Sequence, residues 1–154
     1  MAFLSSLNIP LSGMTAQRFR LDIIAQNVAA ADHYASTPEE AYKRQMVVFG
    51  EDRSFKTVLA RRMREKGPVT NIFNYIQLKG VQATRVVEDP TPAEPVYSPD
   101  NPLADEFGYI YESNVNLQVE EMDAIEAQNS FDANYNIYQA LQGIITSSLS
   151  IGKG

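Results

Sequence analysis

The residues of this sequence that could perform acid–base chemistry are a single histidine and one cluster of acidic side chains. His33 is the only histidine and no elbow-type serine motif accompanies it, so a histidine-based catalytic triad is not expected. Paired carboxylates can hydrolyse glycosides or bind metal ions, and four lie close together: Glu120, Glu121, Asp123 and Glu126. No aromatic and polar residues suited to a cleft surround them. We therefore expect no catalytic residue, no cofactor, no metal site and no small-molecule substrate.

The four carboxylates lie near the start of a long periodic stretch, Leu117 to Ile151, which contains no proline. The positive N-terminal end of a helix stabilises acidic residues in its opening turns. We prefer this interpretation of the cluster. Residues at 3-4 spacing predict one buried stripe along such a helix: Leu117, Ala124, Phe131, Tyr138 and Ile145, with Ala127, Asn134, Leu141 and Ser148. At about 1.5 Å per residue the helix would be roughly 50 Å long, so it needs a partner.

A second helix with a matching stripe is predicted at the N-terminus. Asn8 can cap a helix that runs from about Ile9 to Ala31, with Pro10 tolerated in its first turn. His33 then follows the helix end, where we expect it to have a local role. The stripe consists of Leu4, Leu7, Leu11, Met14, Arg18, Leu21, Ala25 and Val28. We expect the two terminal helices to pair, with the rest of the chain looped out between them.

The apolar face of the C-terminal helix is wider than one partner helix would cover. Ile137, Ile144 and Ile151 form an additional line that would stay exposed in a monomer, and contiguous exposed apolar surface indicates an assembly interface. Gly143, which has small serines nearby, would let another helix approach closely. The residues predicted to pack between subunits are Leu11, Met14, Leu21, Ile24, Val28, Phe131, Tyr138, Leu141, Ile144, Ile145 and Ile151, and Asn27 and Asn134 are predicted to set register.

Composition excludes several classes of protein. The chain has 154 residues, no cysteine and a formal net charge of −6, so disulfides, thiolate sites and a broad duplex-binding surface are excluded. No apolar run approaches the roughly 18 residues of a membrane span, and the N-terminus lacks the features of a cleaved secretory signal. Composition alone would therefore predict a cytoplasmic protein that binds no nucleic acid.

The middle of the sequence predicts short strands and loops. Met46 to Phe49 is rich in β-formers, Val81 to Val86 alternates as in a half-buried strand, and Tyr109 to Tyr111 is a third candidate. The proline-rich stretch from Asp89 to Pro95 is predicted to be an extended, unpaired connection. We expect a small antiparallel arrangement that packs on the helices.

Several motifs resemble bacterial flagellar rod and hook proteins. Residues 12–18 (SGMTAQR) and 21–29 (LDIIAQNVA) resemble the N-terminal signature of that family. Other motifs are similar to its proximal-rod members, in the same order along the chain: 42–49 (YKRQMVVF), 80–81, 87–90 (VEDP), 96–97, 101–105 (NPLAD), 108–109, 114–116 (NVN), 121–122 and 130–134 (SFDAN). Only about Gly50 to Lys79 falls outside the resemblance.

Two departures from the family pattern affect the expected element boundaries. After Asn27 the family usually has Ala-Asn and then Asn-Thr, whereas this chain has alanines at positions 29 to 31. Because alanine favours helix, we expect the first helix to continue about a turn further, towards His33 and Tyr34. Ser113 occupies a position where the family pattern has proline.

The stretch of about residues 50–79 is predicted to be an insertion. Ser54 can cap a helix with an apolar face, followed by a β-like run from Asn71 to Leu78. The helix carries a basic cluster that could contact an acidic partner or form a solvated face, at Arg61, Arg62, Arg64 and Lys66. As a hypothesis, the insert projects from an assembly and touches a neighbouring rod or ring component.

We therefore predict an α+β fold. Residues 1–34 and 114–154 would form a discontinuous terminal helical domain with coiled-coil-like pairing, and 35–113 a β-rich middle region. The resemblance implies a structural subunit of the proximal rod that assembles with other rod subunits and copies of itself, transmits torque and lines an export channel. It also implies a location in the periplasmic part of the basal body, reached by type III export without a cleaved signal.

Three alternatives remain open at this stage. One is another rod subunit, although residues 42–109 favour the proximal rod. The second is an autonomous dimeric coiled-coil adaptor, which a purified monomer with unfolded termini would exclude. The third is a carboxylate enzyme, for which Glu121→Gln would have to abolish turnover without altering assembly.

Overall fold

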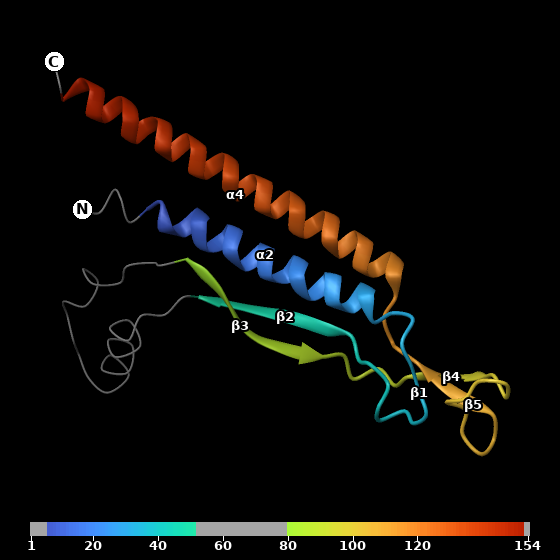
Figure 1. Cartoon of the computed structure of the whole chain (residues 1–154). Helices are drawn as coiled ribbons and strands as arrows, with labels where there is room; N and C mark the ends of the chain where they lie inside the picture. Colours follow the sequence, from blue (N-terminus) through green and yellow to red (C-terminus); the bar gives the residue numbers. More distant parts are fainter. Residues whose placement is uncertain (1–5, 52–79, 153–154) are drawn as a thin grey trace, which may run out of the picture. The chain divides into compact units, whose positions relative to one another are not determined.

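The computed structural model describes residues 6–51 and 80–152, with two long helices and five strands in these ranges (Figure 1). The order is α2 (Asn8–Ala29), β1 (Tyr34–Ala35), β2 (Gln45–Glu51), β3 (Val81–Glu88), β4 (Glu94–Tyr97), β5 (Tyr109–Glu112) and α4 (Leu117–Ile151). The predicted α+β fold, with long terminal helices and antiparallel strands between them, is confirmed. Neither of the helices in the described ranges is long and apolar enough to cross a membrane.

The chain divides into two compact units. The described residues of the first unit are 6–16, 49–51, 80–82 and 130–152, and the second unit comprises Gln17–Val48 and Ala83–Asn129. Each unit combines parts of both helices with residues of the middle region. The division into a terminal helical domain and a β-rich middle region stays a prediction.

Helix α2 begins where the sequence predicted and ends earlier. Its start at Asn8 places Pro10 in the first turn, where the missing N–H costs no helical hydrogen bond. The predicted extension towards His33 and Tyr34 is wrong, because α2 ends at Ala29 and Tyr34 already lies in strand β1. β1 is paired with β5, with Tyr34 opposite Glu112, so strand pairing overrides the helix propensity of the alanines.

Helix α4 has the bounds that its periodicity predicted, Leu117 to Ile151. It starts there because Asn116 is an N-cap: its Oδ1 accepts hydrogen bonds from the backbone N–H groups of Gln118 (3.0 Å) and Val119 (3.3 Å). The predicted stripe marks the inner side, since Ala127 is buried and Phe131, Asn134, Tyr138, Leu141 and Ile145 are half-buried. Leu117 and Ser148 at its two ends are exposed.

The strands form two small sheets. β2 and β3 make a two-stranded sheet, and β1, β5 and β4 make a three-stranded antiparallel sheet in that order. The three predicted strands are confirmed as β2, β3 and β5. The prediction that the stretch from Asp89 to Pro95 is unpaired is wrong at its end, because Glu94 and Pro95 pair with Glu112 and Tyr111. β4 is an edge strand, which explains why a proline without an N–H is tolerated there.

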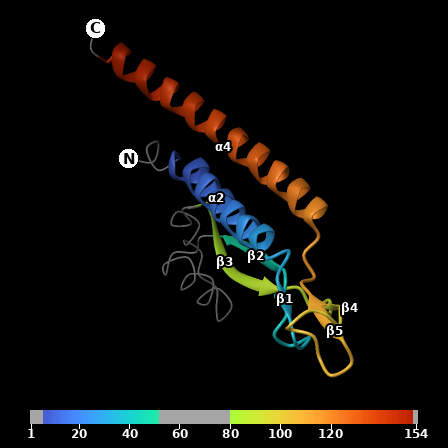
Figure 2. The same ribbon diagram turned by 45° about the vertical axis from the view of Figure 1, so that its right-hand side comes forward.

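Within each unit taken by itself, residues of α2 contact residues of α4 and of the β2–β3 sheet; Figure 2 shows the ribbons of these elements. In the first unit, Ser12 Oγ accepts a hydrogen bond from the N–H of Val81 at 3.1 Å, at the start of β3. A side chain at Gly80 would lie 1.8 Å from that oxygen, and Gly80 has a φ of 106°, so both space and backbone require glycine. In the second unit, Asn27 of α2 bonds to β2 and to α4.

The core is thin and consists mostly of small residues. Its buried apolar members among the described residues are Met14, Ala16, Ile23, Ile24, Ala31, Ala35, Ala41, Ile110 and Ala127. The largest fully buried side chains are polar, Glu120 and Asn27, while many large apolar side chains are exposed. A chain with so little apolar core and so much exposed apolar surface is suited to completing its core against other chains.

The predicted insertion falls on residues outside the described ranges for almost its whole length. This applies to its predicted helix and strand and to the basic cluster of Arg61, Arg62, Arg64 and Lys66.

Buried polar network and candidate assembly faces

The centre of the second unit is a carboxylate that no solvent reaches. Glu120, in the first turn of α4, is 0% exposed, and its neighbour Asn27 of α2 is 1% exposed. Glu120 accepts hydrogen bonds from Arg44 Nε at 2.5 Å and from Asn27 Nδ2 at 3.1 Å. A buried charge is tolerated only when it is paired and hydrogen-bonded, and both carboxylate oxygens of Glu120 are satisfied here.

Arg44 extends this pair into a chain of charges across the two helices. Its Nη2 contacts Asp123 Oδ2 at 2.6 Å, and Asp123 Oδ1 in turn accepts from Arg20 Nη2 of α2 at 2.9 Å. Arg20 also reaches Glu126 at 3.3 Å, on the exposed side. The carboxylates at 120, 123 and 126 therefore lie along one side of α4, and the two arginines bind that side from the loop before β2 and from α2.

Asn27 uses its amide to fasten the loop before β2. Its Oδ1 accepts from the N–H of Gln45 (2.9 Å) and from the hydroxyl of Tyr42 (3.0 Å), while its Nδ2 donates to the carbonyl of Gln45 (2.8 Å) as well as to Glu120. The asparagine thus mimics a strand partner for Gln45 and orients Tyr42. Asn27 is a fixed polar junction between α2, β2 and α4.

The network shifts two pKa values in the same direction. Burial alone would lower the pKa of Arg44, but the hydrogen bond and the charge of Glu120, together with Asp123, outweigh it and the pKa is raised. Burial raises the pKa of the Tyr42 hydroxyl above its ordinary 10.0, and the negative charges of Glu120 and Glu88 add to the effect. Both groups therefore keep their protons at neutral pH. Arg44 can then donate a hydrogen bond to Glu120, and Tyr42 can donate one to Asn27.

These contacts revise the interpretation of the acidic cluster. The sequence attributes the opening-turn position to the helix dipole, but Glu120 and Asp123 are held by arginine side chains. Of the four carboxylates in this described part of the chain, only the exposed Glu121 takes no part in the network. Within residues 6–51 and 80–152, no three acidic or histidine side chains are placed to hold a metal ion. His33 lies in the turn after α2, where its backbone N–H donates to the backbone carbonyl of Ala30 at 3.1 Å.

Two further polar side chains form hydrogen bonds within the second unit. Asn114 accepts from the N–H of Arg44 at 2.6 Å and donates to the carbonyl of Thr91 at 2.8 Å, so it joins the loop before β2 to the loop after β3. Buried Ser113 donates its hydroxyl proton to the carbonyl of Ala31 at 2.8 Å. The two departures from the family pattern thus meet in space, because a proline at 113 could not supply this bond to the alanine segment.

In the first unit, Gly13 of α2 lies directly against Asn134 of α4. A Cβ at position 13 would be 2.7 Å from Asn134 Oδ1, and the Asn134 amide donates to the carbonyl of Ser130 at 2.8 Å. The glycine lets the helices approach closely here. Gly13, Arg20 and Asn27 are seven residues apart, as are Glu120, Ala127 and Asn134, so both helices present heptad lines of small and polar residues.

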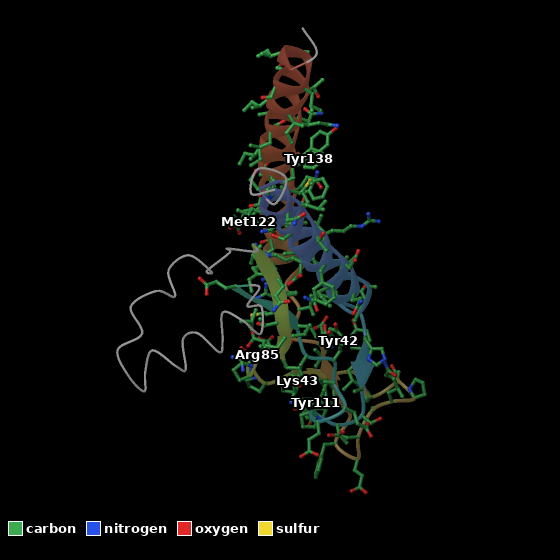
Figure 3. The ribbon with its side chains drawn as sticks, turned by 90° about the vertical axis from the view of Figure 1, so that its left-hand side faces the viewer. Tyr42, Lys43, Arg85, Tyr111, Met122 and Tyr138 are labelled. Atoms are coloured by element: carbon green, nitrogen blue, oxygen red, sulfur yellow. The ribbon has the colours of Figure 1, made fainter. Side chains whose placement is uncertain are left out.

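The predicted packing residues differ in exposure within the single chain. Met14, Ile24 and Asn27 are buried, while Leu21, Phe131, Asn134, Tyr138, Leu141 and Ile145 are half-buried. Leu11, Val28, Ile144 and Ile151 are exposed. Tyr138, on the inner stripe, and the exposed Met122 project from different faces of α4 (Figure 3). The roles of these residues in packing between subunits, and of Asn27 and Asn134 in setting register there, stay predictions.

Comparison with known proteins gives a consistent answer. The flagellar basal-body rod protein FlgC of Bacillus subtilis (strain 168) is 31% identical over 153 residues, covering 96% of this chain and 97% of that protein. That of Borreliella burgdorferi is 30% identical over 164 residues and all of both chains. The chain belongs to the FlgC family. No family model matches the sequence. The FlgC of Salmonella typhimurium is also similar, at 29% identity over 99% of this chain and 100% of its own.

Several motifs that resembled this FlgC family contribute to the network. Asn27 comes from the N-terminal signature, Tyr42 and Arg44 from the motif at 42–49, and Asn114 from the motif at 114–116. In this FlgC-family chain, those side chains join the loops to the helices. Their chemistry is structural: each makes hydrogen bonds to a part of the chain distant from it in sequence.

Sequence reasoning missed Arg20, Arg44 and the burial of Glu120. One signal was present, because Glu120 has the same heptad position as Ala127 and Asn134, which placed a charge on the inner stripe. Such a charge requires a cation opposite it. Nothing in the sequence indicated that the cation would come from a loop 76 residues away.

Proposed function

We propose that this chain is a structural subunit of the flagellar basal-body rod, at the proximal rod. Its family membership supports this, because the relatives that match it over nearly their whole length are named as basal-body rod proteins. Its partners are then other rod subunits and copies of itself, and its surfaces serve assembly rather than catalysis.

The observation that carries the proposal is a second apolar stripe on α4. Ile137, Ile144 and Ile151 are 53%, 52% and 81% exposed, although each is a large aliphatic residue. Together with smaller residues they repeat at 4-3 spacing along the described part of the first unit: Ala133, Ile137, Ala140, Ile144, Ser147 and Ile151. Alternation of isoleucine with small residues is what a second close-packed helix needs.

Gly143 supports the same proposal. In the middle of α4 it costs helix stability, yet nothing in the described part of the chain lies within 4 Å of where its Cβ would be. The inner stripe of α4 meets α2, so the outer stripe is left for helices of neighbouring subunits. Contacts of this heterologous kind stack copies without closing a ring, which gives a tube that can transmit torque and line a channel.

The remaining parts of the proposal follow the family resemblance. The subunit is exported by the flagellar type III route without a cleaved signal and resides in the periplasmic part of the rod. The basic positions Arg61, Arg62, Arg64 and Lys66 lie outside the family resemblance, and we propose from their charge alone that they contact an acidic neighbouring component.

The test is a charge placed on the outer stripe. Ile144→Asp should cost the folded single chain little, because Ile144 is 52% exposed. The variant should keep its helical content by circular dichroism but be missing from purified basal bodies, and the cells should not swim. Gln139→Asp, an exposed position off the stripe on the same helix, is the matched control and should assemble. A swimming strain with Ile144→Asp in its basal bodies would refute the proposal.

A further inference from the structure

The hairpin of β4 and β5, residues 94–112, displays exposed apolar side chains around its loop. Phe107 is 78% and Tyr97 65% exposed, and Leu103 and Tyr109 are also exposed. Tyr97 and Tyr109 stack edge to face, with ring centroids 5.4 Å apart and an interplanar angle of 64°. We call Tyr97, Leu103, Phe107 and Tyr109 the hairpin patch. Exposed aromatic groups of this kind typically anchor binding interfaces.

The hairpin patch is held rigidly. Asp105 Oδ1 accepts from the N–H groups of Phe107 (2.9 Å) and Tyr109 (2.8 Å), and Ser98 N–H donates to the carbonyl of Gly108 at 2.9 Å. Gly108 has a φ of 80°, and a Cβ there would be 3.0 Å from the Tyr97 ring. A surface that is already ordered loses little conformational entropy when a partner binds.

The charge around the patch indicates the chemistry of its partner. Glu94, Asp100 and Glu106 are exposed on β4 and the loop, and the sequence contains no lysine or arginine from Val86 to Gly152. Aromatic faces bordered by carboxylates favour arginine, whose planar guanidinium stacks on the ring and donates to the acid. The patch is therefore suited to an arginine-rich segment.

The same chain carries such a segment. Residues 53–66 contain Arg53, Lys56, Arg61, Arg62, Arg64 and Lys66 against Glu65 alone, which is six of the chain's 13 basic residues. They leave the rest of the chain strongly acidic. We propose that the hairpin patch of one copy binds residues 53–66 of a second copy, so that subunits associate head to tail. This inference rests on the proposed function, in which copies of the chain are neighbours, and assigns them a second contact independent of α4.

The first measurement uses a fluorescent synthetic peptide of residues 53–66 titrated with the full-length protein. The peptide should bind with an affinity that falls as salt is raised, because the contact depends on exposed charges. A Tyr97→Ala/Phe107→Ala chain should bind it about tenfold more weakly or worse, as expected when two exposed anchors are lost. Met122→Ala, which removes an equally exposed residue of α4, is the matched control and should bind as the wild type does.

The second measurement distinguishes two copies from one. An Arg61→Glu/Arg62→Glu/Arg64→Glu chain and a Tyr97→Ala/Phe107→Ala chain should each be monomeric by sedimentation velocity. Mixed, they should form a 1:1 dimer, because one supplies an intact patch and the other an intact basic segment. Monomers in the mixture, or equal peptide affinity for the wild-type and Tyr97→Ala/Phe107→Ala chains, would overturn the inference.

The result is separable from the test of the rod assignment. Ile144→Asp leaves the hairpin patch and the basic segment intact, so that variant should bind the peptide normally even while it fails to enter the rod. If the wild-type chain enters the rod but does not bind the peptide, this contact alone is refuted.

Discussion

Arg44 is the residue whose removal should most disturb the described fold. Arg44→Met keeps much of the side-chain volume but leaves Glu120, fully buried, without its cation. Asp123 keeps Arg20, so the cost falls mainly on Glu120. Breaking a buried ion pair by removing one partner costs about 3–5 kcal/mol, since an unpaired charge stays away from water. For a chain of this size that corresponds to a fall in melting temperature of about 6–20 °C.

The assay is thermal and urea unfolding of the purified full-length chain, followed by circular dichroism. Arg85→Met, at an exposed arginine of β3, is the matched control and should change the free energy of unfolding by less than about 0.5 kcal/mol. Adding Glu120→Met to Arg44→Met should restore much of the loss, because the unpaired charge is then gone. If Arg44→Met costs no more than Arg85→Met, or Glu120→Met gives no recovery, the network does not stabilise the fold as argued.

Two further predictions concern single contacts. Gly13→Ala should not stabilise the wild type, because the new methyl group meets the Asn134 amide. In an Asn134→Ala background the same substitution should raise the free energy of unfolding by about 1 kcal/mol. Equal effects in both backgrounds would contradict this contact. Tyr42→Phe should cost about 1 kcal/mol at neutral pH, because the hydroxyl donates to Asn27. The raised pKa of Tyr42 means that its contribution is present below the ordinary value of 10.0 and is lost as the pH rises through the higher folded-state value. The difference in free energy of unfolding between wild type and Tyr42→Phe, measured with urea, should therefore shrink as the pH rises from 10.0 through the folded-state pKa. A difference that stays constant would contradict the assignment.

Local sequence signals predicted the helices and strands well where one element decides its own limits. The 35 residues of α4 follow from unbroken periodicity and an asparagine cap, and the strands β2, β3 and β5 follow from β-formers bounded by turn residues. The predictions failed where a distant partner intervened. α2 stops before the alanine-rich run is complete because Tyr34 pairs with β5, and Pro95 joins a sheet because it lies on an edge.

The apolar surface left on α4 was also readable from the sequence. A heptad stripe needs one partner, and the line of Ile137, Ile144 and Ile151 exceeded what α2 could cover. The hairpin patch was not predicted, because a phenylalanine or tyrosine in a loop is equally compatible with burial under a neighbouring element. The fold had to show that the hydrogen bonds of Asp105 and Gly108 hold Phe107 outward.

The sequence by itself determined the class of the fold, the length of α4 and the family, because these depend on periodicity, caps and motifs that act within a few residues of each other. Only the tertiary structure decided that Arg44, Asn27 and Glu120 meet in one buried network. The physical reason is that a buried charge gains its partner from wherever the folded chain brings a cation near, and a separation of 76 residues leaves no local trace of that pairing.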